Sequence, residues 1–266
     1  MTGGLATLHP LSAFLRPWLG DTAPGFAGLN RLARERGLTT GNGAPLSFVP
    51  PPSDDLGYEE RAWLSGEVAT RPDNRHDFFN ALIWLAFPRS KAALNRRHYA
   101  ALLESRRQGS AARGTLRDAL TQFDECGVLM AGTSPGLWEA LRAHRWRELF
   151  VERREELMRS TRFLVYGHAS HDLLAAPFVG LCGKALFIEV GAAWLDLPVS
   201  EQLAELDVRL AEWFDSREFS PRDWQPLPLL GIPGATAENE RADYYDNARQ
   251  FRPARTMRPG SSPGNR

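Results

Sequence analysis

Three polar residues stand at the head of an otherwise apolar stretch, RHDFFNALIWLAF. His76 and Asn80 are four residues apart, so they lie on one face of a helix, and Asp77 stands beside His76. A neutral histidine next to a carboxylate suits a general base or a metal ligand. A structural explanation exists as well: with Asn74 as the N-cap, Asp77 meets free N–H groups and the positive end of the helix dipole. The residue types alone leave both interpretations open.

More polar residues follow Pro88 at helical spacing. Lys91, Asn95 and His98 are separated by four and then three residues, which places them on one stripe of a second helix that begins near Ser90. If the two helices fold back on each other at Pro88, both polar stripes face one cleft. The alternative is a solvated helix face. We favour the solvated face for His98, while Lys91 and Asn95 remain candidates for a functional site.

His168 is the next candidate, because it follows the strand-like sequence FLVYG, and loops at strand ends often carry functional residues. His171 and Asp172 come shortly after it, but they lack the His-Glu-x-x-His pattern of metallopeptidases. His-Asp pairs are typical of one class of metal-dependent phosphohydrolases, whose further histidine and aspartate have no convincing counterpart here. The candidate catalytic residues are therefore His76, Asp77, Asn80, Lys91, Asn95 and His168.

The position of two acidic residues and the small number of lysines are both unusual. Asp124 and Glu125 precede Gly127 in an expected last helical turn, where a negative charge opposes the helix dipole at a cost of about 0.3–1 kcal/mol. An arginine is the favoured compensating partner, and a metal ion is the alternative. Lys91 and Lys184 are the only lysines among 32 basic residues. A buried lysine can lose its proton, which an arginine cannot do, so either lysine is a candidate for chemistry.

Composition limits the class of protein. A hydrophobic content of 43% with eight tryptophans predicts a packed globule, and a formal net charge of zero argues against nucleic-acid binding. The longest apolar run, ALIWLAF, is too short to cross a membrane, and the N-terminus lacks the pattern of a signal peptide. Two cysteines form neither a disulfide framework nor a Cys-x-x-Cys pair. We expect a soluble cytoplasmic protein that binds neither membranes nor nucleic acid.

Helices outnumber strands in the expected secondary structure. Apolar residues recur with a helical period over 135–160 and over 197–214, where Ser200 is the expected N-cap. A capping box formed by Thr115 and Asp118 is expected to start another helix. Short strands are expected at the start of LSFVPPP, residues 46–52, and over residues 127–132, 162–167 and 184–191.

The whole pattern predicts the α+β class, because helices dominate and the strands do not alternate regularly with them. We expect a helix-rich single domain over residues 1–253, with a small sheet of short strands and an irregular, proline-rich C-terminal segment. Residues 108–114, QGSAARG, are expected to form a flexible break, and residues 254–266 a disordered tail.

Several strings along the chain together resemble one family. HDFFNALIWLAFPRSKAALN, RDALTQFDECGV, YGHA with GLCGKAL, and the closing LLGIPG and YYDNARQFRP are similar to the uncharacterised bacterial family called domain of unknown function 3025. The resemblance runs from about Tyr58 to Pro253 and implies one coherent domain. It carries over no activity, cofactor or catalytic residue.

Two classes of function follow from these observations. The first is an enzyme acting on a small molecule, in its sharpest form a metal-assisted hydrolase with His76 and Asp77 as acid–base or metal-binding pair and His168 opposite them. The second is a non-enzymatic binding or scaffold protein, in which the same polar residues are caps and buried hydrogen bonds. We prefer the enzyme. The cofactor, the metal and the oligomeric state do not follow from the sequence.

Overall fold

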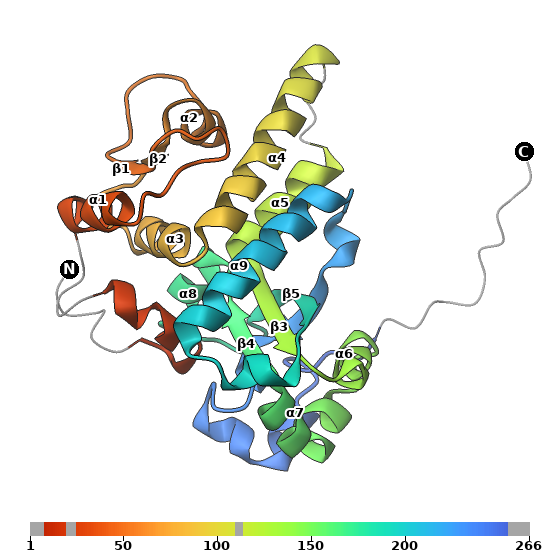
Figure 1. Ribbon diagram of the computed structural model, residues 1–266. Coiled ribbons are helices and arrows are strands. Elements are labelled where there is room, and N and C mark those ends of the chain that lie inside the picture. Colours follow the sequence, from red (N-terminus) through yellow and green to blue (C-terminus); the bar gives the residue numbers. More distant parts are fainter. Residues whose placement is uncertain (1–7, 20–24, 110–113, 255–266) are drawn as a thin grey trace, which may run out of the picture.

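The computed structural model describes residues 8–19, 25–109 and 114–254 (Figure 1). Within them, helices surround two small sheets, so the expected α+β class is confirmed. The expected break at 108–114 and tail at 254–266 fall largely outside the described residues. None of the described helices is both long and apolar enough to span a membrane.

The larger sheet has four strands in the order β4-β3-β5-β6. Its centre is β3 (Gly127–Gly132), which runs parallel to β5 (Cys182–Glu189) and antiparallel to β4 (Thr161–Val165). Every residue of β3 is buried, because successive side chains point to opposite faces and both faces are covered. Leu129 and Ala131 belong to one apolar cluster, and Val128 and Met130 to the other.

One face of this sheet is covered by α3 (Arg75–Ala86), α4 (Pro88–Arg107), α5 (Thr115–Cys126) and α9 (Val199–Ser216). The short helix α8 (His168–Leu173) packs against α3 and α5, and all of these helices except α9 carry candidate residues. Figure 1 shows α4 lying along α9. The side chain of Asn74 accepts a hydrogen bond from the backbone N–H of Asp77 at 2.9 Å, which confirms it as the N-cap of α3. After this first turn α3 is buried on all sides, as its unbroken apolar run predicts.

The junction between α3 and α4 is tighter than the sequence indicates. The second helix begins at Pro88, two residues before the expected start at Ser90, because proline is well suited to the first helical position. Its free N–H groups are satisfied by Asp207 of α9, which accepts hydrogen bonds from the backbone of Arg89 at 2.9 Å and of Ser90 at 2.8 Å.

Two expected caps are wrong. Thr115 is the first helical residue of α5, and Gly114 precedes it as the cap without a side-chain hydrogen bond. Similarly, α9 begins at Val199 after Pro198, so Ser200 lies inside its first turn. In both places the chain enters the helix one or two residues earlier than the capping pattern predicts.

The single helix expected over 135–160 is also wrong. The chain forms α6 (Pro135–Arg142), a short π-helix at Glu148–Glu152 and α7 (Arg154–Ser160) instead. His144 adopts a φ of 54°, which a right-handed helix does not allow, so the segment turns there. The pieces cover the second face of the sheet.

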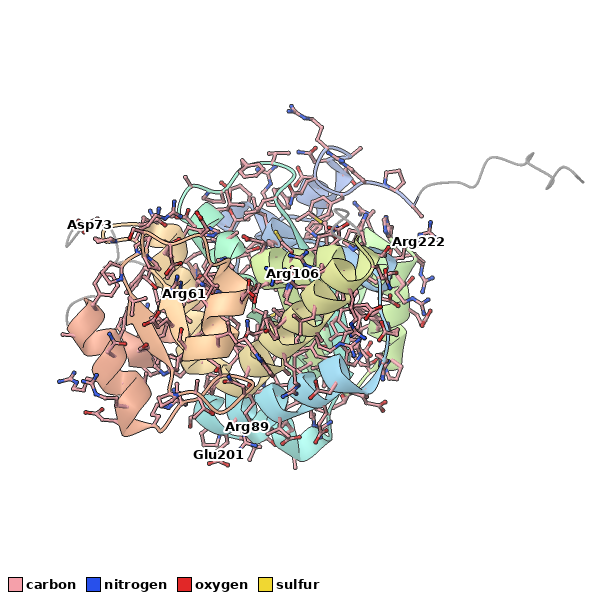
Figure 2. The ribbon with its side chains drawn as sticks, turned by 90° about the horizontal axis from the view of Figure 1, so that it is seen from above. Arg61, Asp73, Arg89, Arg106, Glu201 and Arg222 are labelled. Carbon is pink, nitrogen blue, oxygen red and sulfur yellow. The ribbon has the colours of Figure 1, made fainter. Side chains whose placement is uncertain are left out.

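The remaining elements form the periphery. The segment expected to be irregular after residue 220 contains an edge strand, β6 (Gln225–Pro228), where prolines are tolerated because one side of the strand needs no hydrogen bonds. Charged side chains are spread over the surface, as Asp73, Arg89, Glu201 and Arg222 indicate in Figure 2. The other elements are α1 (Phe26–Glu35), β1 (Ser47–Val49), α2 (Tyr58–Ser65), β2 (Glu67–Ala69), and 3-10 turns at Pro10–Trp18, Ala192–Asp196, Pro221–Asp223, Leu229–Gly231, Ala237–Glu240 and Ala242–Asp246.

Candidate functional site

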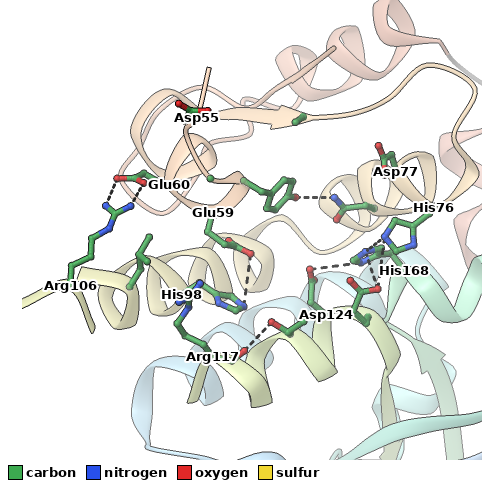
Figure 3. Close-up of a pocket in the computed structure, with 17 residues that line it drawn as sticks. Asp55, Glu59, Glu60, His76, Asp77, His98, Arg106, Arg117, Asp124 and His168 are labelled. Carbon is green, nitrogen blue, oxygen red and sulfur yellow. Dashed lines mark hydrogen bonds and ion pairs between the residues drawn. The ribbon is translucent and has the colours of Figure 1, made fainter. Parts of the chain in front are cut away.

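A cavity of about 710 Å³ lies between α2, α3, α4 and α5 and ends at the first residue of α8 (Figure 3). Ionisable side chains line it on every side, from Glu59 on α2 to His98 on α4 and His76 on α3. Sites for small molecules are typically clefts of about 300–1,000 Å³, and they often lie between helices.

Three side chains converge at one end of this cavity. His76 is the second residue of α3, Glu125 stands in the last turn of α5, and His168 opens α8. Nε2 of His76 lies 3.1 Å from Nε2 of His168. Oε2 of Glu125 lies 3.5 Å from Nε2 of His168 and 3.9 Å from Nε2 of His76. We call these three residues the ligand triad.

The separations in the ligand triad suit a single metal ion. Bonds of about 2.0–2.1 Å in a tetrahedral zinc site place neighbouring donor atoms about 3.3 Å apart. The three observed separations of 3.1, 3.5 and 3.9 Å lie close to this value. The side chains of His76 and Glu125 are about one third exposed, at 35% and 37%, so the triad remains open toward the cavity. Two histidines and one carboxylate with an open fourth position are typical of catalytic zinc sites.

A glycine allows the third member of the triad to reach the other two. Gly167 joins β4 to α8 and packs directly on the end of α5, where a Cβ atom would lie 2.4 Å from the backbone nitrogen of Cys126. The backbone N–H of Gly167 also donates to the carbonyl of Gly127 at 2.8 Å. This close approach of backbone to backbone places His168 beside Glu125.

The protonation state of His168 suits metal binding. Its side chain is 5% exposed, and burial lowers the pKa of its imidazole to about 4 despite the nearby Asp124 carboxylate. The ring is therefore neutral at physiological pH, which leaves one nitrogen with a free lone pair. A metal ion requires that form of histidine.

Behind the triad lies a buried ion pair. Nζ of Lys91 donates to Oδ1 of Asp124 at 2.5 Å and to Oδ1 of Asn80 at 2.9 Å. Burial raises the pKa of Asp124, but the ammonium of Lys91, followed by His168, more than offsets this and holds the pKa below its ordinary value. The carboxylate is thus ionised next to a lysine that is only 1% exposed.

A second group of polar residues occupies another wall of the cavity. Oε2 of Glu59 accepts a hydrogen bond from Nδ2 of Asn95 at 2.7 Å, and Nε2 of His98 lies 3.9 Å from Oε1 of Glu59. Arg106 forms two hydrogen bonds of 2.7 Å with Glu60, so this arginine is already paired. Glu59 and His98 therefore present a carboxylate and an imidazole to the same cavity as the triad.

The structure brings together most of the candidates that the sequence indicates. His76 and His168 are in contact, and Asn80 and Lys91 share one hydrogen-bond network behind them. Asn95 lies farther along α4 and holds Glu59. His98 is only 2% exposed, so its expected place on a solvated face is wrong.

Asp77 has a different role from its neighbour His76. Its carboxylate accepts hydrogen bonds from the backbone nitrogen, Nε and a terminal nitrogen of Arg71, each at 2.8 Å. The Arg71 pairing therefore occupies both oxygens of this carboxylate. The residue ties the loop before α3 to the helix and does not join the triad.

The carboxylates of the site were only partly indicated by the sequence. The unfavourable position of Asp124 and Glu125 in a last helical turn was a signal, and the buried partner of Asp124 is a lysine rather than the favoured arginine. Glu59 gave no signal of this kind. Its position at the start of α2 looks like an ordinary acidic residue in a first helical turn.

A comparison with known protein families identifies the family of this chain. The family described as "Protein of unknown function (DUF3025)" matches residues 46–255, which include every member of the triad. The chain belongs to this family. No curated protein and no solved structure matches it significantly. The resemblance that the sequence strings indicate is thus confirmed, over a slightly longer range.

Proposed function

We propose that this protein is a metal-assisted hydrolytic enzyme that acts on a small molecule in the cavity. The observation that carries the proposal is the ligand triad, whose donor atoms are separated by 3.1, 3.5 and 3.9 Å at an open end of the cavity. Two imidazoles favour a transition-metal ion such as Zn²⁺ over Mg²⁺ or Ca²⁺, which prefer oxygen ligands. Such an ion, held by these three residues, would activate a water molecule as a nucleophile near neutral pH.

Different residues of the cavity have different roles in this proposal. His76, Glu125 and His168 bind the ion, and Glu125 replaces Asp77 as the acidic member of the site. Glu59 and His98 line the same cavity and would be the groups that exchange protons with a substrate bound there. Asn95 fixes Glu59 through its 2.7 Å hydrogen bond. The volume of about 710 Å³ admits a small molecule and not a folded macromolecule.

Metal analysis joined to a hydrolysis assay tests the proposal. We expect about one transition-metal ion per chain after purification, and cleavage of at least one of a panel of nitrophenyl carboxylate and phosphate esters. A chelator should abolish the cleavage and Zn²⁺ should restore it. His76→Gln and His168→Gln should lose both metal and cleavage, while His144→Gln, at a half-buried histidine outside the cavity lining, should keep both.

The non-enzymatic alternative gives the opposite result. If the polar residues serve only as caps and buried hydrogen bonds, His76→Gln lowers the melting temperature while metal content and hydrolysis stay at the level of an unrelated protein. Metal-free wild-type protein without esterase or phosphoesterase activity would favour the scaffold and overturn the enzyme.

A further inference from the structure

Lys91 is a buried cation held by a complete set of partners. Its ammonium donates to Asp124 and Asn80, and it lies 5.3 Å from the centre of the Trp84 ring. Burying an ammonium is costly unless it is paired and hydrogen-bonded. The chain has 30 arginines and only two lysines, so a lysine at this buried position indicates a contact that an arginine would not make.

The partners of Lys91 are themselves fixed. Nδ2 of Asn80 donates to the hydroxyl oxygen of Tyr58 at 2.8 Å, and Nε1 of Trp84 donates to the same oxygen at 3.2 Å. Asn80 therefore turns its carbonyl oxygen toward Lys91 and cannot reverse its amide without losing both bonds. These bonds hold the ammonium of Lys91 in one position, and the ammonium in turn holds Oδ1 of Asp124.

The second oxygen of Asp124 faces the triad. Oδ2 lies 3.8 Å from Nδ1 of His168, which is longer than a hydrogen bond, so the carboxylate acts on this nitrogen through its charge. Nε2 of the same ring points to His76 and Glu125. A negative charge next to the far nitrogen of a histidine favours the tautomer with the proton on that nitrogen, which leaves the other nitrogen free to bind a metal ion. Here the carboxylate is anchored on its other side by an ammonium, so it is prevented from turning away.

We propose that Lys91 is a positioning residue of the metal centre: through Asp124 it holds the imidazole of His168 with Nε2 toward His76 and Glu125. The inference rests on the proposed metal function. Lys91 itself touches neither metal nor substrate. Its effect is on the orientation of one ligand, and so on the affinity and the coordination geometry of the ion.

Titration with Co²⁺ tests this role, because the visible absorption of bound Co²⁺ reports coordination geometry and a purely structural residue would not change it. We expect the folded Lys91→Met variant to bind Co²⁺ about 10–100-fold more weakly than the wild type, with an altered visible spectrum. Lys184→Met, at the other lysine and outside the cavity, is the matched control and should retain the wild-type affinity and spectrum. Folding is checked by circular dichroism.

Removal of one partner from a buried ion pair can prevent folding, so a second variant keeps the question open to measurement. Lys91→Met combined with Asp124→Leu replaces the pair by apolar side chains, which is generally tolerated, and should show the same weakened binding. Wild-type affinity and spectrum in either folded variant would overturn the positioning role while leaving the metal centre intact. A wild-type chain that binds no Co²⁺ would instead overturn the metal centre and this inference with it.

Discussion

At the scale of single residues, Glu125 decides whether the two histidines form a binding site or only a close contact. Its Oε2 is the one carboxylate oxygen within 4 Å of both imidazole Nε2 atoms among the described residues. We expect Glu125→Gln to weaken Zn²⁺ binding by more than about 100-fold, because loss of an outer partner of a ligand already costs 10–100-fold. Equilibrium dialysis against Zn²⁺ measures this. Glu139→Gln, at an exposed residue of α6, is the control, and equal affinity in both variants would contradict the assignment.

A buried histidine outside the triad, His171, makes the stability of the fold depend on pH. His171 is 1% exposed, and burial lowers the pKa of its imidazole to about 3. Its Nε2 donates to the carbonyl of Val165 at 2.9 Å, and its Nδ1 accepts from the hydroxyl of Ser12 at 2.7 Å. The unfolded chain takes up a proton at this position below about pH 6.5, and the folded chain does so only near pH 3. The unfolded state therefore binds more protons in this window, and the free energy of unfolding falls as the pH falls.

The size of this effect can be measured by comparison with His171→Gln. The histidine contributes a slope of about 1.4 kcal/mol per pH unit between pH 6 and 4. We expect the variant to be less stable at pH 7, where it loses a buried hydrogen bond, but to show a shallower decline toward pH 4. Urea unfolding at several pH values gives both slopes. Parallel curves would show that His171 does not remain neutral in the folded state.

At the scale of elements, the connection from β4 to α8 positions the site. A Cβ atom at Gly167 would meet the backbone of Glu125 and Cys126 at 2.4 Å, and backbone cannot move aside as a side chain can. We expect Gly167→Ala to push α8 away from α5, to lower the free energy of unfolding by about 1–3 kcal/mol, and to weaken Zn²⁺ binding. Gly191→Ala is the control, because nothing lies within 4 Å of its Cβ position. Chemical denaturation and dialysis are the measurements; equal behaviour of the two variants would refute the role of this contact.

The elements that follow from local chemistry are those that the sequence predicts well. The start of α3 at Asn74 and the buried strand β3 depend on a cap and on an apolar run, both of which are visible in a short window. The break at His144 is not visible in this way, because the periodicity of 135–160 continues through it and only the packing on the sheet requires the turn. The edge strand β6 escaped prediction because its prolines are tolerated only at an edge, and the sequence does not say which strand lies there.

The same distinction between local signals and long-range packing applies to the site. His76 and His168 were identifiable from residue type and from their places at element ends, but 92 residues separate them, and their contact depends on how α3 packs against α8. Glu125 was recognisable only as an acidic residue in an unfavourable place. The pairing of Glu59 with His98 required the fold itself, because the cavity that they line is formed by α2 and α4 together.

At the scale of the whole molecule, the triad joins three elements that are distant in the sequence. His76 comes from α3, Glu125 from α5 and His168 from α8. Helices α3 and α5 share one apolar cluster on the central sheet, and α8 packs against both of them. An ion bound by all three links these helices directly. Unfolding of these helices then requires release of the ion, so binding contributes to the free energy of unfolding.

This coupling gives a prediction for thermal unfolding. Zn²⁺ at about 100 times its dissociation constant adds about 2.7 kcal/mol to the free energy of unfolding, which corresponds to a rise in melting temperature of roughly 5–10 °C for a chain of this size. Differential scanning fluorimetry with and without a chelator measures the rise. His76→Gln should melt close to the metal-free wild type, because its side chain is 35% exposed, but should gain nothing from Zn²⁺. An equal rise in the variant would place the ion elsewhere on the molecule.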